Sequence, residues 1–171
     1  SREHVQKIAL FCDVDPECVI EELDAKPNIY QIPVMLNEQN LDDLICDRLK
    51  LDTAPIDLSP WTDMLKVLNN PEHVVDVAVV GKYIGRQSAY ESIYAALEHG
   101  GIANRTQVRV RRVESEDIEA AGPQECLEGV HGVLVPGGFG NRGIEGKIQA
   151  VRYARENGIP FFGICRSEER R

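Results

Sequence analysis

A cysteine at the end of an apolar run and a cluster of glycines upstream of it are the residues of this chain best suited to chemistry. Cys165 follows "PFFGI", which has the composition of a buried strand. A sharp turn that presents a nucleophile after a strand usually has glycine two positions before and two positions after it, because small residues let the strained turn form. Gly163 supplies the first glycine, and Ser167 stands where the second is expected. The pattern favours a thiolate that attacks a carbonyl carbon over an ordinary buried cysteine.

The glycine cluster "PGGFGNRGIEG" (136–146) holds five glycines in eleven residues after another apolar run. Glycines at the end of a strand let backbone N–H groups approach a developing oxyanion closely. Either feature alone has an ordinary interpretation, a turn or a core cysteine, but together they indicate acyl-transfer chemistry. The cluster matches neither the P-loop nor the dinucleotide-binding pattern, and Arg142 stays a candidate for a nucleotide contact.

Alternating strands and helices must position these residues. From Val74 onward, β-branched and alternating runs predict strands, and amphipathic spacing predicts helices between them. Such an order gives right-handed crossovers and an α/β fold with a doubly wound parallel sheet, in which ligands bind at the carboxyl ends of strands. Ser88 and Glu91 have capping-box spacing, and Gly100 with Gly101 predicts the end of that helix. The strands are expected at 74–81, 106–113, 131–135 and 160–164, and the helices at 88–101, 116–127 and 144–156.

The first part of the chain differs from the second. "KIALFCDV" (7–14) is expected to be a strand, with a helix beginning after Asp15 and Pro16 and another helix ending at Leu49. "DTAPIDLSP" is rich in proline and turn formers and predicts a connector, followed by a short amphipathic helix from Pro60. We expect three parts: a domain end at 1–49, a linker with a short helix at 50–73, and a second domain at 74–171.

Composition excludes several classes of protein. The 171 residues are 43% hydrophobic with a formal net charge of −9, which argues against nucleic acid as a partner. No apolar stretch long enough to span a membrane and no secretory signal pattern occur, so a cytoplasmic protein with no membrane partner is expected. The five cysteines are odd in number and include no C-x-x-C pair, so neither a disulfide framework nor a metal site is predicted.

Long ordered segments resemble the CTP synthase family. They are "KIALFC", "LDDLICDRL", "VAVVGKYIGRQSAYESIYAALEHGG" and "VLVPGGFGNRGIEGKIQAVRYARENGIPFFGIC". The resemblance implies the tail of a P-loop-type α/β amidoligase domain, a linker, and the first half of a class I glutamine amidotransferase domain. It also implies a homo-tetramer that aminates UTP to CTP with ATP and Mg²⁺, using ammonia released from glutamine, with GTP as allosteric activator.

The same resemblance implies roles for individual residues. Cys165 would be the glutaminase nucleophile, and Gly138, Phe139 and Gly140 would form the glutamine and oxyanion loop. The remaining implied roles are UTP binding for Lys7, ATP binding for Leu23, Asp24 and Ala25, and a lid associated with GTP activation for Arg142 and Glu145. Without the resemblance, Lys7 and Asp24 are ordinary surface residues.

After Cys165 the chain continues with "RSEERR", whereas the family continues with Leu-Gly-Met-Gln and supplies a catalytic His and Glu further on. This difference predicts an internal fragment, closed by a frameshift or a gene-prediction artefact, which is inactive as synthase and as glutaminase. Three alternatives stay open: another class I amidotransferase, a non-catalytic remnant that binds glutamine or a nucleotide, or a role in assembly. The segment "KIALFC" argues against the first, and binding of a glutamine analogue without turnover would support the second.

Overall fold

The computed structural model describes residues 2–165, with the side chain of Gln87 left aside. The chain divides into two compact units, Ser1–Lys66 and Val67–Arg171, and each is described here by itself. The division falls inside the predicted linker 50–73; the predicted boundaries after residues 49 and 73 stay predictions.

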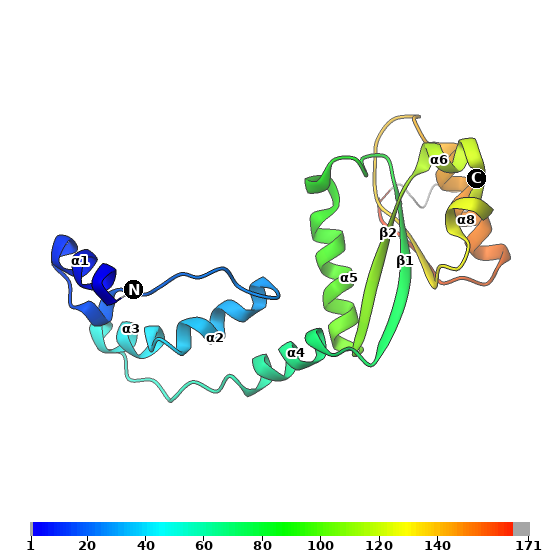
Figure 1. Ribbon diagram of the computed structural model, residues 1–171. Coiled ribbons are helices and arrows are strands. Elements are labelled where there is room, and N and C mark those ends of the chain that lie inside the picture. The colour runs from blue at the N-terminus through cyan, green and yellow to red at the C-terminus, as the bar shows by residue number, and fades with distance from the viewer. Residues whose placement is uncertain (1, 166–171) are drawn as a thin grey trace. The chain divides into compact units, whose positions relative to one another are not determined.

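The first unit is helical. Its helices are α1 (Arg2–Cys12), α2 (Ile32–Asn37) and α3 (Leu41–Leu49), with 3₁₀ turns at Pro16–Cys18 and Ile29–Gln31, and α4 (Ser59–Asn69) begins in it (Figure 1). The predicted strand at 7–14 is wrong, because Lys7 to Cys12 lie in α1. In the described part of this unit no strand is available to pair with such a segment, and a helix satisfies its own backbone hydrogen bonds.

Sequence signals in the rest of the first unit give mixed results. Asp15 and Pro16 do begin a helical turn, but it ends at Cys18 instead of continuing. The predicted helix that ends at Leu49 and the helix beyond Pro60 are confirmed as α3 and α4, with no helix or strand between them. Trp61 on α4 donates from its indole Nε1 to the carbonyl of Tyr30 at 2.7 Å, which fixes α4 on the loop before α2.

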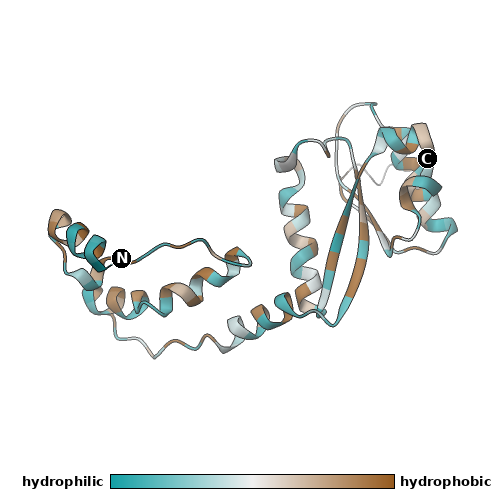
Figure 2. Ribbon diagram, viewed as in Figure 1, coloured by the Kyte–Doolittle hydropathy of each residue, from teal (hydrophilic) through white to brown (hydrophobic). Residues whose placement is uncertain are grey.

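The second unit is built on a four-stranded parallel sheet with the order β2-β1-β3-β4. Its strands are β1 (His73–Gly81), β2 (Thr106–Glu114), β3 (Gly132–Val135) and β4 (Phe161–Gly163), so the four predicted strands are confirmed. In Figure 2, hydrophobic residues recur along β1, which is central, while hydrophilic and hydrophobic residues alternate along β2, which is at an edge. A strand buried on both faces needs a continuous apolar run, and an edge strand with one solvated face needs alternation.

Helices cover both faces of this sheet. One face carries α5 (Glu91–Ala103), and the other carries α6 (Ser115–Ala121), α7 (Pro123–Leu127) and α8 (Ile144–Glu156) (Figure 1). The core lies under α6 to α8, where the fully buried side chains include Ile118 and Leu127. The doubly wound α/β arrangement expected from the sequence is therefore present.

Two local predictions in α5 are wrong. A 3₁₀ turn (Gln87–Tyr90) precedes the helix, so Ser88 and Glu91 form no capping box. The helix also continues through both glycines to Ala103. A Cβ on Gly101 would lie 2.4 Å from the carbonyl oxygen of Thr106, so this glycine permits the close approach of α5 to the start of β2 instead of ending the helix.

Close approach also requires glycine where α8 meets α6. A Cβ on Gly146 would lie 1.8 Å from the carbonyl oxygen of Ser115, while the N–H of Gly146 donates to Glu119 at 3.0 Å. Alanine at position 146 therefore cannot fit unless the two helices separate. None of the helices within residues 2–165 is both long and apolar enough to cross a membrane.

Opposite effects are expected from the same substitution at two helical glycines. Gly146→Ala should lower the free energy of unfolding by about 1–3 kcal/mol, as overpacked sites do. Gly100→Ala in α5 should raise it by up to about 1 kcal/mol, because nothing lies within 4 Å of its Cβ position and alanine is the better helix former. Hydrogen exchange of the slowest amides of β1 measures both. A stabilising Gly146→Ala would contradict the helix contact.

Candidate active site

The four parallel strands end at one edge of the sheet, and their register brings chemically distinct residues to the same level. Arg112, Val79, Leu134 and Phe162 pair side by side across the sheet. The residues three positions after these four are, in the same order, Ser115, Lys82, Gly137 and Cys165. Because the strands are parallel, this row lies at the carboxyl edge, where ligands of such sheets bind.

Cys165 has the backbone geometry expected of a nucleophile after a strand. Its φ is +62°, in the left-handed region that side-chain-bearing residues rarely adopt. The N–H of Ile164 donates to Val135 at 3.0 Å, so the chain is still paired with β3 one residue before the cysteine. The side chain of Cys165 is exposed. Ser167, where the turn motif would have its second glycine, lies outside the described residues.

The glycine loop lies directly against this cysteine. A Cβ built on Gly137 would lie 3.0 Å from the Cβ of Cys165 and 3.5 Å from its Sγ. Any larger residue at position 137 would therefore press on the thiol. The loop and the cysteine that the sequence singled out separately are in contact.

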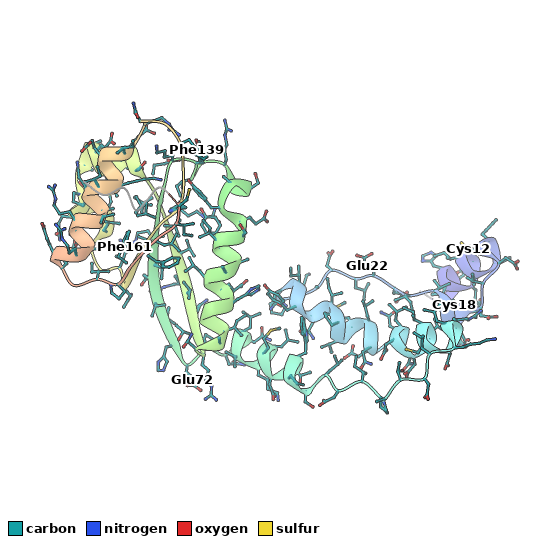
Figure 3. All side chains as sticks on the ribbon, turned by 180° about the vertical axis from the view of Figure 1, so that it is seen from behind. Cys12, Cys18, Glu22, Glu72, Phe139 and Phe161 are labelled. Carbon is teal, nitrogen blue, oxygen red and sulfur yellow. The ribbon has the colours of Figure 1, made fainter. Side chains whose placement is uncertain are left out.

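Gly138, Phe139 and Gly140 continue this loop. Gly138 faces two lysines, because its Cβ position lies 3.4 Å from the Nζ of Lys147 and 3.4 Å from the Cδ of Lys82. Gly140 has a φ of +80°, which turns the chain at a conformation that favours glycine. The Phe139 ring is 74% exposed and lies on the loop beyond the end of the sheet (Figure 3).

Two buried lysines hold the loop from inside, and sequence reasoning missed both. Lys147 on α8 is 8% exposed and donates to the carbonyl of Pro136 at 2.8 Å. Lys82, just after β1, is 3% exposed and donates to the carbonyls of Phe139, at 3.5 Å, and Gly140. Burial, and then the neighbouring Lys82 cation, lower the pKa of Lys147 to about 8, while Cys165 acts in the opposite direction.

Lys82 is itself fixed from two sides. Its backbone N–H donates to the Tyr90 hydroxyl at 3.2 Å, and the Tyr90 ring packs on Gly81, where a Cβ would lie 2.6 Å from it. Its carbonyl accepts from Arg142, which also pairs with Glu116 of α6. Burial raises the pKa of Tyr90, so the phenol keeps its proton while its oxygen accepts this N–H.

Of the predicted lid residues, Arg142 lies on the same loop and Glu145 lies in the helix that follows it. Besides the contacts with Lys82 and Glu116, Arg142 lies with its guanidinium carbon 5.8 Å from the centre of the Tyr83 ring. Glu145 is exposed in the first turn of α8. Gly143, with a φ of +67°, packs on Ser115, whose buried hydroxyl has no hydrogen-bond partner among the described residues.

The predicted nucleotide-binding residues lie in the first unit. Lys7 lies on α1 and its Nζ pairs with Glu3 at 2.9 Å on the exposed surface. Leu23, Asp24 and Ala25 lie in the irregular segment before α2, and Leu23 is 63% exposed. No group of three His, Cys, Asp or Glu side chains that could hold a metal ion occurs among residues 2–165.

Two histidines of the second unit lie at the far end of the sheet from Cys165. His73 begins β1, and His131 immediately precedes β3, where its Nδ1 accepts the N–H of Asp76 at 3.0 Å. His73 lies nine residues before Lys82 and His131 lies six residues before Gly137, which corresponds to about 30 Å and about 20 Å of extended chain. Neither histidine can therefore act as a base for Cys165 within this unit.

The lowered pKa of Lys147 predicts a pH-dependent stability. Between its folded pKa of about 8 and the ordinary value of 10.5, the unfolded chain holds a proton that the folded chain has lost. The free energy of unfolding should therefore rise with pH across this window. Lys147→Met should remove that rise, as urea titrations between pH 7 and 10 would measure. Lys66→Met, at a side chain that is 74% exposed, is the control and should keep it.

Comparisons with known proteins identify both units. Residues 1–51 match the family model for the CTP synthase N-terminus, and residues 87–167 match that for glutamine amidotransferase class-I. CTP synthase of Desulfitobacterium hafniense is 49% identical over 96% of this chain and 31% of its own length. CTP synthase of Pelotomaculum thermopropionicum is 47% identical over 96% of this chain and 30% of its own length.

Among solved structures, the glutaminase domain of Trypanosoma brucei CTPS with bound acivicin is similar to this chain. The two are 41% identical over 52% of this chain and 35% of that one, with a TM-score of 0.48. The chain spans about three tenths of the length of the curated relatives. Since the matches run along nearly all of its residues and include both family models, the chain belongs to the CTP synthase family, and its second unit is part of a class I glutamine amidotransferase domain.

Proposed function

We propose that this chain carries the nucleophile half of the glutaminase site of a CTP synthase, with Cys165 as the attacking thiolate. One observation supports this most strongly: Cys165 has a left-handed backbone at the end of β4 and lies against Gly137 of the glycine loop. A nucleophile on a sharp turn beside a loop of backbone donors is the arrangement that acyl transfer requires.

In the proposed reaction the Cys165 sulfur attacks the side-chain carboxamide carbon of glutamine and forms a C–S bond. The carbonyl oxygen becomes an oxyanion, which the backbone N–H groups of the loop around Gly138 would stabilise. The C–N bond then breaks, and the nitrogen leaves as ammonia with an added proton. Water hydrolyses the glutamyl thioester, which releases glutamate and restores the thiol. Removing one such oxyanion donor typically costs about 3–4 kcal/mol of transition-state stabilisation.

The whole protein would use this ammonia in an ATP-dependent amination of UTP to CTP, with Mg²⁺ as metal and GTP as activator. Family membership supports this proposal, together with the match of residues 1–51 to the CTP synthase N-terminus. Lys7, as an exposed cation on α1, would meet the UTP triphosphate, and Leu23, Asp24 and Ala25 would lie against the adenine of ATP. A cytoplasmic homo-tetramer is the proposed state of the whole protein.

Arg142 and Glu145 are proposed to couple this site to GTP. Arg142 contacts both Lys82 at the end of β1 and Glu116 of α6, so a ligand that draws its guanidinium away would release contacts on the loop beside Cys165. An Arg guanidinium suits such a role because it binds phosphate in a bidentate manner.

Selective chemistry at Cys165 tests the glutaminase proposal, with Cys12 as an internal control because it is the other exposed cysteine. An electrophilic glutamine analogue should label Cys165 and leave Cys12 unmodified, whereas iodoacetamide should label both. Free glutamine should slow labelling of Cys165 alone. Peptide mapping by mass spectrometry measures each site, and Cys165→Ala should abolish capture while Cys12→Ala should not.

Equal labelling of Cys165 and Cys12 by the analogue would contradict a glutamine site. So would a rate of Cys165 labelling that free glutamine does not slow. Release of ammonia from glutamine is measured in parallel. Capture without ammonia release would support the alternative of a glutamine-binding module over a working glutaminase.

A further inference from the structure

The glycine loop extends past the point where the sheet can hold it. The last backbone hydrogen bond between β3 and the β4 segment runs from the N–H of Ile164 to the carbonyl of Val135. Beyond it, side chains bind the loop's carbonyls: Lys147 binds Pro136, and Lys82 binds Phe139 and Gly140. Among residues 2–165, two ammonium groups therefore take the place of a neighbouring strand along this stretch.

Because peptide units are planar, these contacts also determine where the backbone N–H groups of the loop point. In a trans peptide the N–H points opposite to the C=O of the same unit. The carbonyls of Pro136, Phe139 and Gly140 point at lysines, so the N–H groups of the residues that follow them point away from the ammonium groups. Those donors belong to Gly137, Gly140 and Asn141.

The loop also presents different faces to the lysines and to the thiol. The Cβ direction of Gly138 meets Lys147 and Lys82, whereas that of Gly137 meets Cys165. The lysines and the nucleophile therefore lie against different faces of one short stretch of backbone.

Holding the loop this way costs stability. Lys82 and Lys147 are 3% and 8% exposed, and neither pairs with a carboxylate among the described residues. Burial of two neighbouring like charges is unfavourable, and methionine would fill a similar volume without that penalty. A role in packing alone does not account for the two charges.

We propose that Lys82 and Lys147 are positioning residues, which keep the carbonyls of the glycine loop turned inward so that its N–H groups stay available on the side of Cys165. The proposal rests on the glutaminase function proposed above. Neither lysine needs to contact glutamine. Tyr90 and Arg142 assist by fixing the N–H and the carbonyl of Lys82 itself.

Amide ¹⁵N relaxation of the full chain tests the positioning directly. In Lys147→Met, and separately in Lys82→Met, the order parameters of the amides of residues 137–141 should fall from about 0.85 to below about 0.6, while those of Val77 to Val80 in β1 stay near about 0.85. Lys66→Met, at an exposed lysine paired with Asp63, should change neither set. Unchanged loop order parameters in both variants, or an equal fall in β1, would overturn the proposal.

Capture of an electrophilic glutamine analogue by Cys165 is the second readout. Either methionine variant should lower the capture rate about ten-fold for an analogue with an aldehyde in place of the carboxamide, because an oxyanion develops when the thiolate attacks its carbonyl carbon. Alkylation by iodoacetamide should change less than about two-fold, because there the thiolate attacks the methylene carbon, iodide leaves, and no oxyanion forms. If the unmodified chain captures the analogue, an unaltered capture rate in both variants would also overturn the proposal. If the unmodified chain captures no analogue but the variants loosen the loop, the glutaminase function fails and the positioning role stands.

Discussion

Parallel register at the carboxyl edge of one small sheet is the constraint on which the rest of the site depends. Because β2, β1, β3 and β4 run the same way, the chain leaves the sheet four times at one edge. Ser115, Lys82, Gly137 and Cys165 follow residues that pair across all four strands. A shift of one residue between β3 and β4 would separate the loop from the cysteine, and a shift of another strand would turn its following side chain to the other face.

At this edge, the orientation of Cys165 and of the glycine loop is achieved at a cost in folding free energy. Cys165 adopts a left-handed backbone, and two lysines are buried where their charges repel each other and cost desolvation energy. The packing below compensates, since Ile118, Leu127, Val80 and Val135 are fully buried in the core. Rigid helices also contribute, because Gly146 lets α8 approach α6 closely enough to carry Lys147 under the loop.

Patterns that arise from local burial could be predicted from the sequence, and features that depend on distant partners could not. The β-branched run of β1 and the paired appearance of Cys165 and the glycine loop were sufficient to predict the sheet and the centre of the site. The segment at 7–14 was misassigned because a short apolar run suits a strand or a helix equally, and tertiary partners decide. The sequence predicts a helix stop at Gly101 because the contact of this glycine with Thr106 is not encoded in the neighbouring residues. Lys147 was overlooked because lysines are mostly exposed, although it lies between Ile144 and Val151 at helical spacing.

The edge position of β4 explains why the loop must be held from elsewhere. This strand has three residues and, within residues 2–165, pairs only with β3, and its Phe162 side chain is 64% exposed. So short a strand with one described neighbour cannot fix the residue that follows it. Contact with Gly137 supplies a second constraint on Cys165, and that contact is only as firm as the loop itself. The position of the Cys165 thiol therefore depends on Gly137, whose loop is held at the carbonyl of Pro136. The group that holds this carbonyl is the buried ammonium of Lys147 on α8.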